Sequence, residues 1–249
     1  MGRRDTRILE LLGERGRMEV AQLSEELGVS QVTVRKDLDS LAARRLVRRE
    51  HGFAQLGSPD DITGRLAYHY AVKQRIARRA AGLVADGETV MVESGSCCAL
   101  FARALFEGRS DVTVVTNSAF IASYVRDLPA ASVVLLAGTY QMDAQVTVGP
   151  LVRTSVAGIH VNKLFVGVDG FDEEERFTNA NQLRAQAISD MAAQASQVVV
   201  VTESEKFGQR GVVAVDLSGR PVTVVTDAGI TDEARGRLAV AGIALVVAE

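Results

Sequence analysis

The sequence predicts an α/β protein of two parts, an N-terminal winged helix-turn-helix followed by a largely parallel α/β domain. In the first part, apolar residues recur at helical spacing around a short connection that contains glycine. In the second part, short Val-rich runs alternate with Ala-rich amphipathic segments, which is typical of a parallel sheet covered by helices on both faces. We expect the winged domain at 1–57, a linker at 58–72 and the α/β domain at 73–249.

Three helices are expected in the N-terminal domain. Ile8 to Leu12 predict the first helix, which we expect to end at Gly13 and Gly16. A second helix, over 20–27, should stop at Gly28. Ser30 is a suitable N-cap for the third helix, and the very short connection between the second and third helices is typical of a helix-turn-helix unit.

The third helix has the composition of a DNA recognition helix. Val34, Leu38 and Leu41 share the core-facing side, so short polar and long basic side chains project from its N-terminal turns. Val47 and the turn at Gly52 predict a β-hairpin, or wing, after it. The residues expected at DNA are Ser30, Gln31, Thr33, Arg35, Lys36, Arg48, Arg49 and His51. We expect Asp37 to pair with a basic residue of the protein instead.

Charge supports this location for DNA binding. The net charge is −3 overall, yet residues 1–57 carry eleven Lys or Arg against nine Asp or Glu. A basic cluster in an acidic protein indicates an anionic partner, although a solvated surface would look the same. The cluster comprises Arg35, Lys36, Arg44, Arg45, Arg48 and Arg49. A three-helix bundle with a basic face and no DNA remains the structural alternative.

Seven Val-rich runs define the expected sheet of the second domain. They lie at 89–93, 112–116, 132–137, 163–168, 198–202, 222–226 and 243–247, and the expected helices between them at 98–107, 119–127, 183–195 and 231–241. Ligands of open α/β sheets bind beyond the carboxyl ends of the strands. That rule selects Glu93, Ser94, Gly95, Ser96, Cys97, Thr116, Asn117, Gly138, Asp169 and Lys206.

These strand-end residues suit a phosphate on a polyhydroxylated ligand. Free N–H groups and hydroxyls at the start of the helix near Ser96 would form an anion-binding nest, and Lys206 would add a positive charge. Glu93, Asn117 and Asp169 offer hydrogen-bond partners for hydroxyls. An ordinary tight turn at 94–96 and a solvated helix end at Lys206 are the alternatives.

Residues 3–54 resemble the winged helix of the DeoR family of bacterial transcription regulators. The matching stretches are RILELL, LGVS, SQVTVRKDLDSL and RREHGFA. Residues 61–249 resemble the family's sensor domain, which is related to ribose-5-phosphate isomerase and the CoA-transferase group. Here the matches are Arg65, Lys73, ESGS at 93–96, TNS at 116–118, FVGVDGF at 165–171 and ESEKFG at 203–208. The resemblance implies a repressor of a sugar or sugar-alcohol catabolism operon, released from its operator by a phosphorylated sugar.

The chain departs from the family pattern at several positions. Phe53 stands in the wing where glycine is usual, Glu93 where aspartate is usual, and Gly138-Thr139-Tyr140 where a Gly-Gly pair is usual. Arg184 replaces a usual glutamate. Its guanidinium would either clamp a phosphate or lie at the surface, so it joins the candidate effector residues.

The alternative function is a phosphosugar isomerase-like enzyme with a DNA-binding head. Glu93 and Lys206 could act as base and oxyanion stabiliser, but no Ser-His-Asp order, metal-ligand cluster or Walker A loop is present. Cys97 and Cys98 suit either a reactive thiol or small core packing. We therefore expect no enzymatic activity and neither cofactor nor metal.

The expected partners are a double-stranded DNA operator, a phosphorylated sugar and further copies of the chain in a dimer or tetramer. We expect no membrane partner, because the apolar runs are far shorter than the ~20 residues of a spanning helix. The charged N-terminus shows no secretion signal, and the adjacent cysteines form no disulfide framework, so a cytoplasmic location is expected. The sequence leaves open the operator, the sugar, and whether the protein represses or activates.

Overall fold

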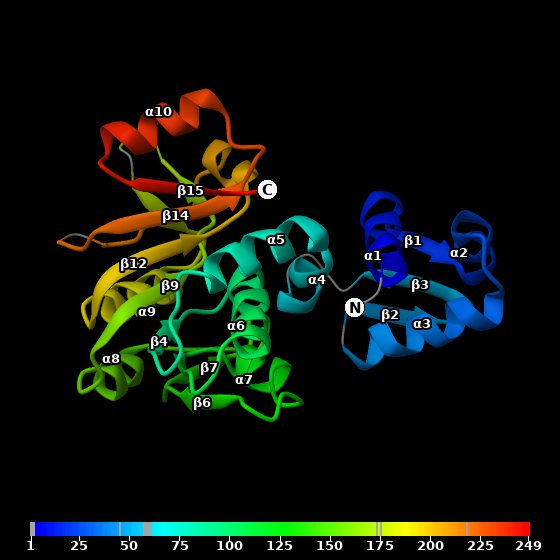
Figure 1. Ribbon diagram of the computed structural model, residues 1–249, viewed down its shortest axis with the longest axis horizontal. Helices are drawn as coiled ribbons and strands as arrows, with labels where there is room; N and C mark the ends of the chain where they lie inside the picture. The colour runs from blue at the N-terminus through cyan, green and yellow to red at the C-terminus, as the bar shows by residue number, and fades with distance from the viewer. Residues whose placement is uncertain (1–2, 45, 57–60, 173, 175, 218) are drawn as a thin grey trace. The chain divides into compact units, whose positions relative to one another are not determined.

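In the computed structural model, the described residues up to Leu56 form three helices and a three-stranded sheet (Figure 1). The structure describes residues 3–44, 46–56, 61–172, 174, 176–217 and 219–249. Arg45 of the predicted basic cluster, and 57–60 of the predicted linker, therefore lie outside the described residues. The chain divides into unit 1, Met1–Ala71, and unit 2, Val72–Glu249.

The helices of unit 1 begin and end largely where the sequence predicts. Helix α1, Arg3–Arg15, continues through Gly13, so the expected end at Gly13 is wrong; the helix stops at Gly16, whose φ is 74°. Helix α2, Val20–Leu27, ends at Gly28 with a left-handed φ of 63°. Helix α3, Gln31–Ala43, begins after Ser30, whose Oγ accepts the Thr33 N–H at 3.2 Å.

The wing is a two-stranded hairpin, as predicted. Strands β2, Val47–Glu50, and β3, Phe53–Leu56, pair antiparallel across His51 and Gly52, which both have positive φ values of 39° and 88°. Positive φ at both central residues is the geometry of a tight hairpin turn. A third strand, β1 (Arg17–Glu19), pairs with β3. Because β1 has three residues and only one of them is buried, it shows no alternating pattern from which a strand could be predicted.

Part of the predicted linker is helical. Helix α4, Ile62–Ala67, is capped by Asp61, whose Oδ1 accepts the Gly64 N–H at 2.8 Å. Ile62 and Leu66 are buried on it. The polar composition of 57–64 indicates a turn, but the Asp cap and two apolar residues one turn apart were sufficient for a helix. Helix α5 follows at Tyr70–Ala81.

Unit 2 is built on a seven-stranded parallel sheet, which confirms the predicted class. The strand order is β15-β14-β12-β9-β4-β5-β6 (Figure 1). All seven predicted Val-rich runs are strands of this sheet: β4 Thr89–Val92, β5 Thr113–Thr116, β6 Ser132–Leu135, β9 Val161–Val166, β12 Ala195–Val201, β14 Val222–Asp227 and β15 Ala244–Ala248.

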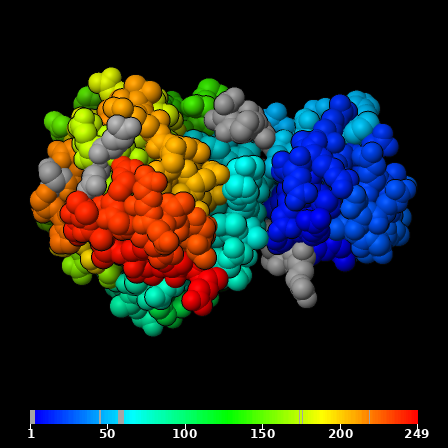
Figure 2. All heavy atoms as spheres, turned by 90° about the horizontal axis from the view of Figure 1, so that it is seen from above, coloured from blue at the N-terminus to red at the C-terminus, as the bar shows by residue number. Residues whose placement is uncertain are grey.

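Helices cover both faces of this sheet. On one face lies α6, Ser96–Gly108, whose Phe101 ring stacks on Phe165 of β9 with centroids 4.0 Å apart; α7, Ala119–Tyr124, packs beside it. The opposite face belongs to α8 (Pro150–Val156), α9 (Gln182–Ala192) and α10 (Asp232–Val240), which share one buried cluster with Leu164 of β9. Figure 2 shows the orange-to-red atoms of α10 and β15 at the surface of unit 2.

Several small elements escaped the sequence analysis because each spans few residues. Strands β7 (Thr139–Gln141) and β8 (Val146–Val148) form a hairpin. A second sheet joins β10 (Gly170–Phe171), β11 (Phe177–Asn179) and β13 (Val213–Ala214), and a 3-10 helix, η1, spans Ser204–Gly208. None of the helices in the described ranges has the length and apolar character needed to cross a bilayer.

The strand order reverses between β4 and β9. The chain runs from β4 through β5 to β6 in one direction, then returns to β9 on the other side of β4 and continues outward to β12, β14 and β15. At such a reversal the connections leave the sheet in opposite directions, and ligands of open α/β sheets bind at this point beyond the carboxyl ends of the strands. The turns after β4 and β9 are therefore the first place to seek a site.

Replacing Phe101 with alanine should destabilise unit 2 strongly. The ring is fully buried and stacked on Phe165, so its loss leaves a cavity that costs about 3–5 kcal/mol. Denaturant unfolding of the full chain, followed by circular dichroism, measures this change. Tyr140→Ala, at an aromatic residue that is half exposed, is the control and should change stability by less than about 0.5 kcal/mol. Equal effects of the two substitutions would contradict the packing described.

Candidate functional site

The recognition helix α3 carries two side-chain pairs in its first turns. The hydroxyls of Ser30 and Thr33 are 2.9 Å apart, and both are engaged at the helix cap. Arg35 Nη2 donates to Gln31 Oε1 at 3.1 Å, which aligns these two side chains along the exposed side of the helix. Lys36 has no ion pair with any residue that the structure describes, so its charge is available to a partner.

Carboxylates attach the recognition helix to its neighbours. Asp37 accepts two hydrogen bonds from Arg4 of α1, at 2.5 and 2.9 Å, which confirms that Asp37 pairs within the protein. Asp39 forms an ion pair with Arg49 of the wing. Helix α1 and the wing are thereby both held against α3, which fixes how the basic side chains of α3 and of the wing lie relative to one another.

The wing has one feature that the family pattern does not anticipate. Phe53 lies beneath the guanidinium of Arg17, which is 4.0 Å from the ring centroid across β1 and β3. The side chain at this position therefore packs on the sheet. Arg48 lies 3.5 Å from Asp61, and His51 is exposed at the hairpin turn.

Glu93 is the most perturbed carboxyl at the strand-order reversal. Its backbone N–H donates to Phe165 O at 2.9 Å, and its side chain is only 2% exposed. Ser94 Oγ donates to Oε1 at 2.6 Å, while Oε2 is buried and has no hydrogen-bond partner among the described residues. Burial raises the pKa of Glu93 to about 7, although the Ser94 hydroxyl, the charge of Arg184 and the backbone N–H of Gly167 act in the opposite direction.

Arg184 lies close enough to Glu93 to act on it electrostatically. It is in the first turn of α9, where the side chain of Asn181 caps its backbone N–H at 3.1 Å. Its Nε is buried without a hydrogen-bond partner, and within the described ranges it forms no ion pair with Glu93. Glu93 Oε2, a buried acceptor, and Arg184 Nε, a buried donor, thus both lack a hydrogen-bond partner among the described residues.

Several charged side chains act electrostatically on Cys97 at the start of α6. Lys73 Nζ of α5 lies 3.2 Å from Glu203 Oε2, and both side chains are more than nine-tenths buried. Burial raises the pKa of the Cys97 thiol to about 12, and the charges of Lys73, Glu203 and Lys206 also act on it. The thiol is therefore protonated at neutral pH, which favours the core-packing interpretation over a reactive thiol.

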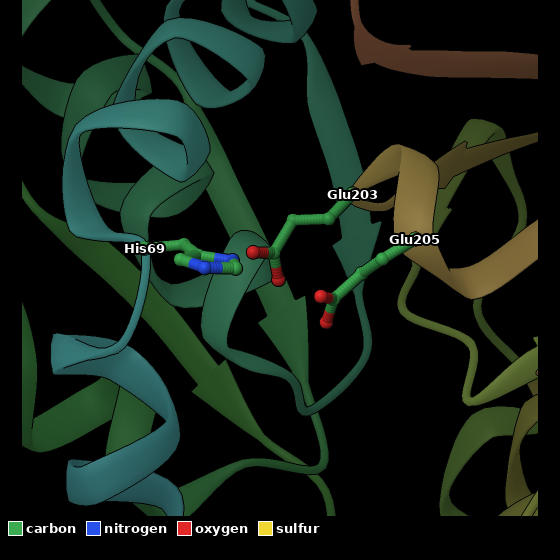
Figure 3. A group of neighbouring side chains, drawn as sticks. All are labelled: His69, Glu203 and Glu205. Carbon is green, nitrogen blue, oxygen red and sulfur yellow. The ribbon is translucent and has the colours of Figure 1, made fainter. Parts of the chain in front are cut away.

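The turn after β12 supplies the remaining charges of this group. Figure 3 shows Glu203, the N-cap of η1, and Glu205 on η1 with side chains that extend from the same side of the turn. Lys206 Nζ donates to Gln209 Oε1 at 2.9 Å and lies 3.6 Å from Glu205. Glu203 was not selected from the sequence, although it lies two residues beyond the end of β12.

Four other predicted effector residues have internal partners. Thr116 Oγ1 accepts the Ser118 N–H at 3.0 Å. Asn117 Nδ2 donates to Thr147 O at 3.1 Å, while Asn117 Oδ1 is buried without a hydrogen-bond partner among the described residues. Asp169 Oδ2 accepts the Ala180 N–H at 2.8 Å. A Cβ at Gly138 would lie 2.8 Å from Thr147 Cβ, so glycine is needed there for close packing. These contacts give each residue a role in the fold itself.

The remaining candidates surround the start of α6. Ser94 and Gly95 form the turn after β4, Gly95 is the N-cap, and Ser96 and Cys97 begin the helix. The first N–H groups of an α-helix have no partner within the helix. The charge of Arg184 acts on the buried Glu93 carboxyl, and that of Lys206 acts on Cys97 at the start of the helix.

A winged helix with a basic recognition helix, followed by an α/β unit with polar residues at its strand-order reversal, defines a DNA-binding regulator with a second, sensing domain. The model of the DeoR-like helix-turn-helix domain matches residues 4–59, and that of the DeoR C terminal sensor domain matches residues 68–228. The chain belongs to the DeoR family of transcriptional regulators.

Two named relatives and one solved structure illustrate the similarity. The HTH-type transcriptional repressor GlcR of Bacillus subtilis is 29% identical over 81% of this chain and 78% of its own length. The L-fucose operon activator of Haemophilus influenzae is 24% identical over 93% and 94%. A D-ribose-5-phosphate isomerase in complex with phospho-erythronic acid has 16% identity and a TM-score of 0.41, over 55% of this chain and 54% of that one.

Glu93→Gln should change how stability depends on pH. Because the folded-state pKa of Glu93 is raised from 4.5 to about 7, the folded state holds a proton there that the unfolded state has lost. Its contribution is complete below the unfolded value and is lost as the pH rises through about 7. The wild type should therefore lose about 3 kcal/mol relative to Glu93→Gln between about pH 4.5 and pH 8.

Urea unfolding of the full chain at both pH values measures this difference. Glu107→Gln, which alters an exposed carboxylate of α6, controls for the change in net charge. A stability difference between wild type and Glu93→Gln that is the same at both pH values would contradict the raised pKa.

Proposed function

We propose that this regulator represses a sugar or sugar-alcohol catabolism operon and leaves its operator when a phosphorylated sugar binds to unit 2. Helix α3 and the wing contact the operator through Gln31, Arg35, Lys36, Arg48, Arg49 and His51, while Ser30 and Thr33 order the first turn of α3. The effector binds where the strand order reverses, at Glu93, Ser94, Gly95, Ser96, Arg184 and Lys206. Thr116, Asn117, Gly138 and Asp169 support the neighbouring turns, and Cys97 packs beneath the start of α6.

The observation that carries the effector proposal is that two buried atoms, Glu93 Oε2 and Arg184 Nε, have no hydrogen-bond partner among the described residues. Burying a polar atom without a hydrogen bond costs about 1–3 kcal/mol, so a ligand that supplies the missing partner of either atom gains that energy. Sugar hydroxyls can donate to the carboxyl oxygen and accept from the guanidinium. A phosphate on the same ligand would bind the N–H groups at the start of α6 and the charge of Lys206.

The buried Lys73–Glu203 pair supports a link between this site and helix α5. Both residues act electrostatically on Cys97, so the pair lies beside the helix start at which we place the phosphate. An anion there attracts Lys73 and repels Glu203. We therefore assign the coupling to the 65–73 segment, and the effector shifts the protein to a form with lower operator affinity.

Tight operator binding requires more than one winged domain. A single winged domain makes few phosphate contacts, and such binding weakens steeply as salt concentration rises. Two heads on one homo-oligomer act at a high effective concentration, so we propose that the chain assembles as a dimer or tetramer. The effector then acts by favouring an arrangement of heads that does not match the spacing of the half-sites.

The isomerase alternative is distinguished by turnover. An isomerase needs a carboxylate base, and Glu93 with its pKa near 7 has the chemistry for that role. We propose a binding function because the named relatives are transcriptional regulators. Incubation of the pure protein with pentose and hexose phosphates should give no interconversion. A rate comparable to that of a dedicated isomerase would overturn the binding proposal.

Arg35→Ala should weaken operator binding about tenfold, because it removes a guanidinium that contacts base or phosphate. Fluorescence anisotropy with duplexes selected by the wild-type protein measures the affinity. Arg126→Ala, at an exposed arginine of unit 2, is the matched control and should bind as the wild type does. The thermal shift caused by the effector should persist in both variants; its loss in Arg35→Ala would contradict separate binding functions.

Lys206→Ala should raise the effector concentration needed for operator release about tenfold, while binding of the operator without effector stays close to that of the wild type. The effector is identified first by a thermal-shift screen of phosphorylated sugars and sugar alcohols, with inorganic phosphate and the unphosphorylated sugars alongside. Arg126→Ala is again the control. An unchanged response of Lys206→Ala would exclude Lys206 from the effector site.

A further inference from the structure

Val32 is an apolar residue on the exposed side of the recognition helix. Its side chain is 72% exposed, although it stands only two residues after the N-cap Ser30. At about 100° per residue, Val32 lies about 160° around the helix axis from the fully buried Val34. The side chain therefore points away from the core of unit 1, on the same face as Lys36 one turn later.

Nothing in the stability of the helix favours valine at this position. A β-branched side chain lowers helix propensity relative to alanine, and at 72% exposure it buries little apolar area. The neighbouring side chains have other engagements, since Thr33 is bonded at the cap and Gln31 accepts from Arg35. Among the described residues of the first turn, Val32 is the one whose methyl groups are exposed to solvent.

In the major groove, the apolar group that a protein side chain meets is the C5-methyl of thymine. The outward face of a recognition helix near its N-terminus is the part that reaches base edges. We infer that Val32 contacts a thymine methyl in each operator half-site and so specifies thymine over cytosine at that base pair. The inference rests on operator binding through α3, and it adds a residue that reads sequence through apolar contact.

The test compares thymine with deoxyuridine, which differs only by that methyl. Duplexes are first selected from a random library with the full-length wild-type protein, and each thymine of the half-site is then replaced in turn. At one position, the wild type should bind the deoxyuridine duplex about fourfold more weakly per half-site, the effect of one buried methyl. Val32→Ala should bind the two duplexes equally, as tightly as the wild type binds the deoxyuridine duplex.

Val240→Ala is the matched control, because Val240 is also a helical valine and is 82% exposed, on α10 of unit 2. It should show the full wild-type preference for thymine. Equal binding of thymine and deoxyuridine duplexes by the wild type at every position would overturn the inference while operator binding stands. So would a preference that survives in Val32→Ala. If the wild type enriches no sequence at all, operator binding fails, and the inference fails with it.

Discussion

The reversal of strand order between β4 and β9 is the constraint on which unit 2 depends. Because all seven strands are parallel, their carboxyl ends meet at one edge, and the reversal separates the turns after β4 and β9 there. The backbone of Glu93 is tied to Phe165, the residue paired with Val92, so the first residue beyond β4 stays registered to β9. Helix α6 then begins three residues later, with its N-terminus at the same edge.

The same edge of the sheet places the Glu93 carboxyl in surroundings that disfavour its ionised form. Glu93 is buried without a partner for Oε2, and its raised pKa shows that the ionised form is destabilised in the folded protein. Stability alone would favour an apolar residue at such a position. Retaining a carboxyl beside an arginine whose Nε is also unmet is consistent with a proposed ligand that supplies the missing hydrogen bonds.

The sequence predicts the parts of the fold that depend on repeated patterns. Val-rich runs identified every strand of the large sheet, because strands buried on both faces need apolar residues throughout. The caps at Ser30 and Gly28 were equally predictable from the sequence, since each satisfies backbone groups of its own helix end. Gly13 failed as a helix end because a single glycine costs only about 1 kcal/mol within a helix whose apolar face is fully buried.

The candidate site was less predictable, because sequence position fixes where a residue lies but not which atoms are already bonded. Thr116 ends β5 and Asn117 follows it, much as Glu93 follows β4, yet their side chains bond the backbone of Ser118 and Thr147. The same distinction applies to α3, where Thr33 is bonded at the cap and Val32 is exposed. Polar type predicts Thr33 as a DNA contact and gives no weight to Val32. Hydrogen-bond partners and exposure, which only the folded chain reveals, are what support Val32 as a further proposed contact.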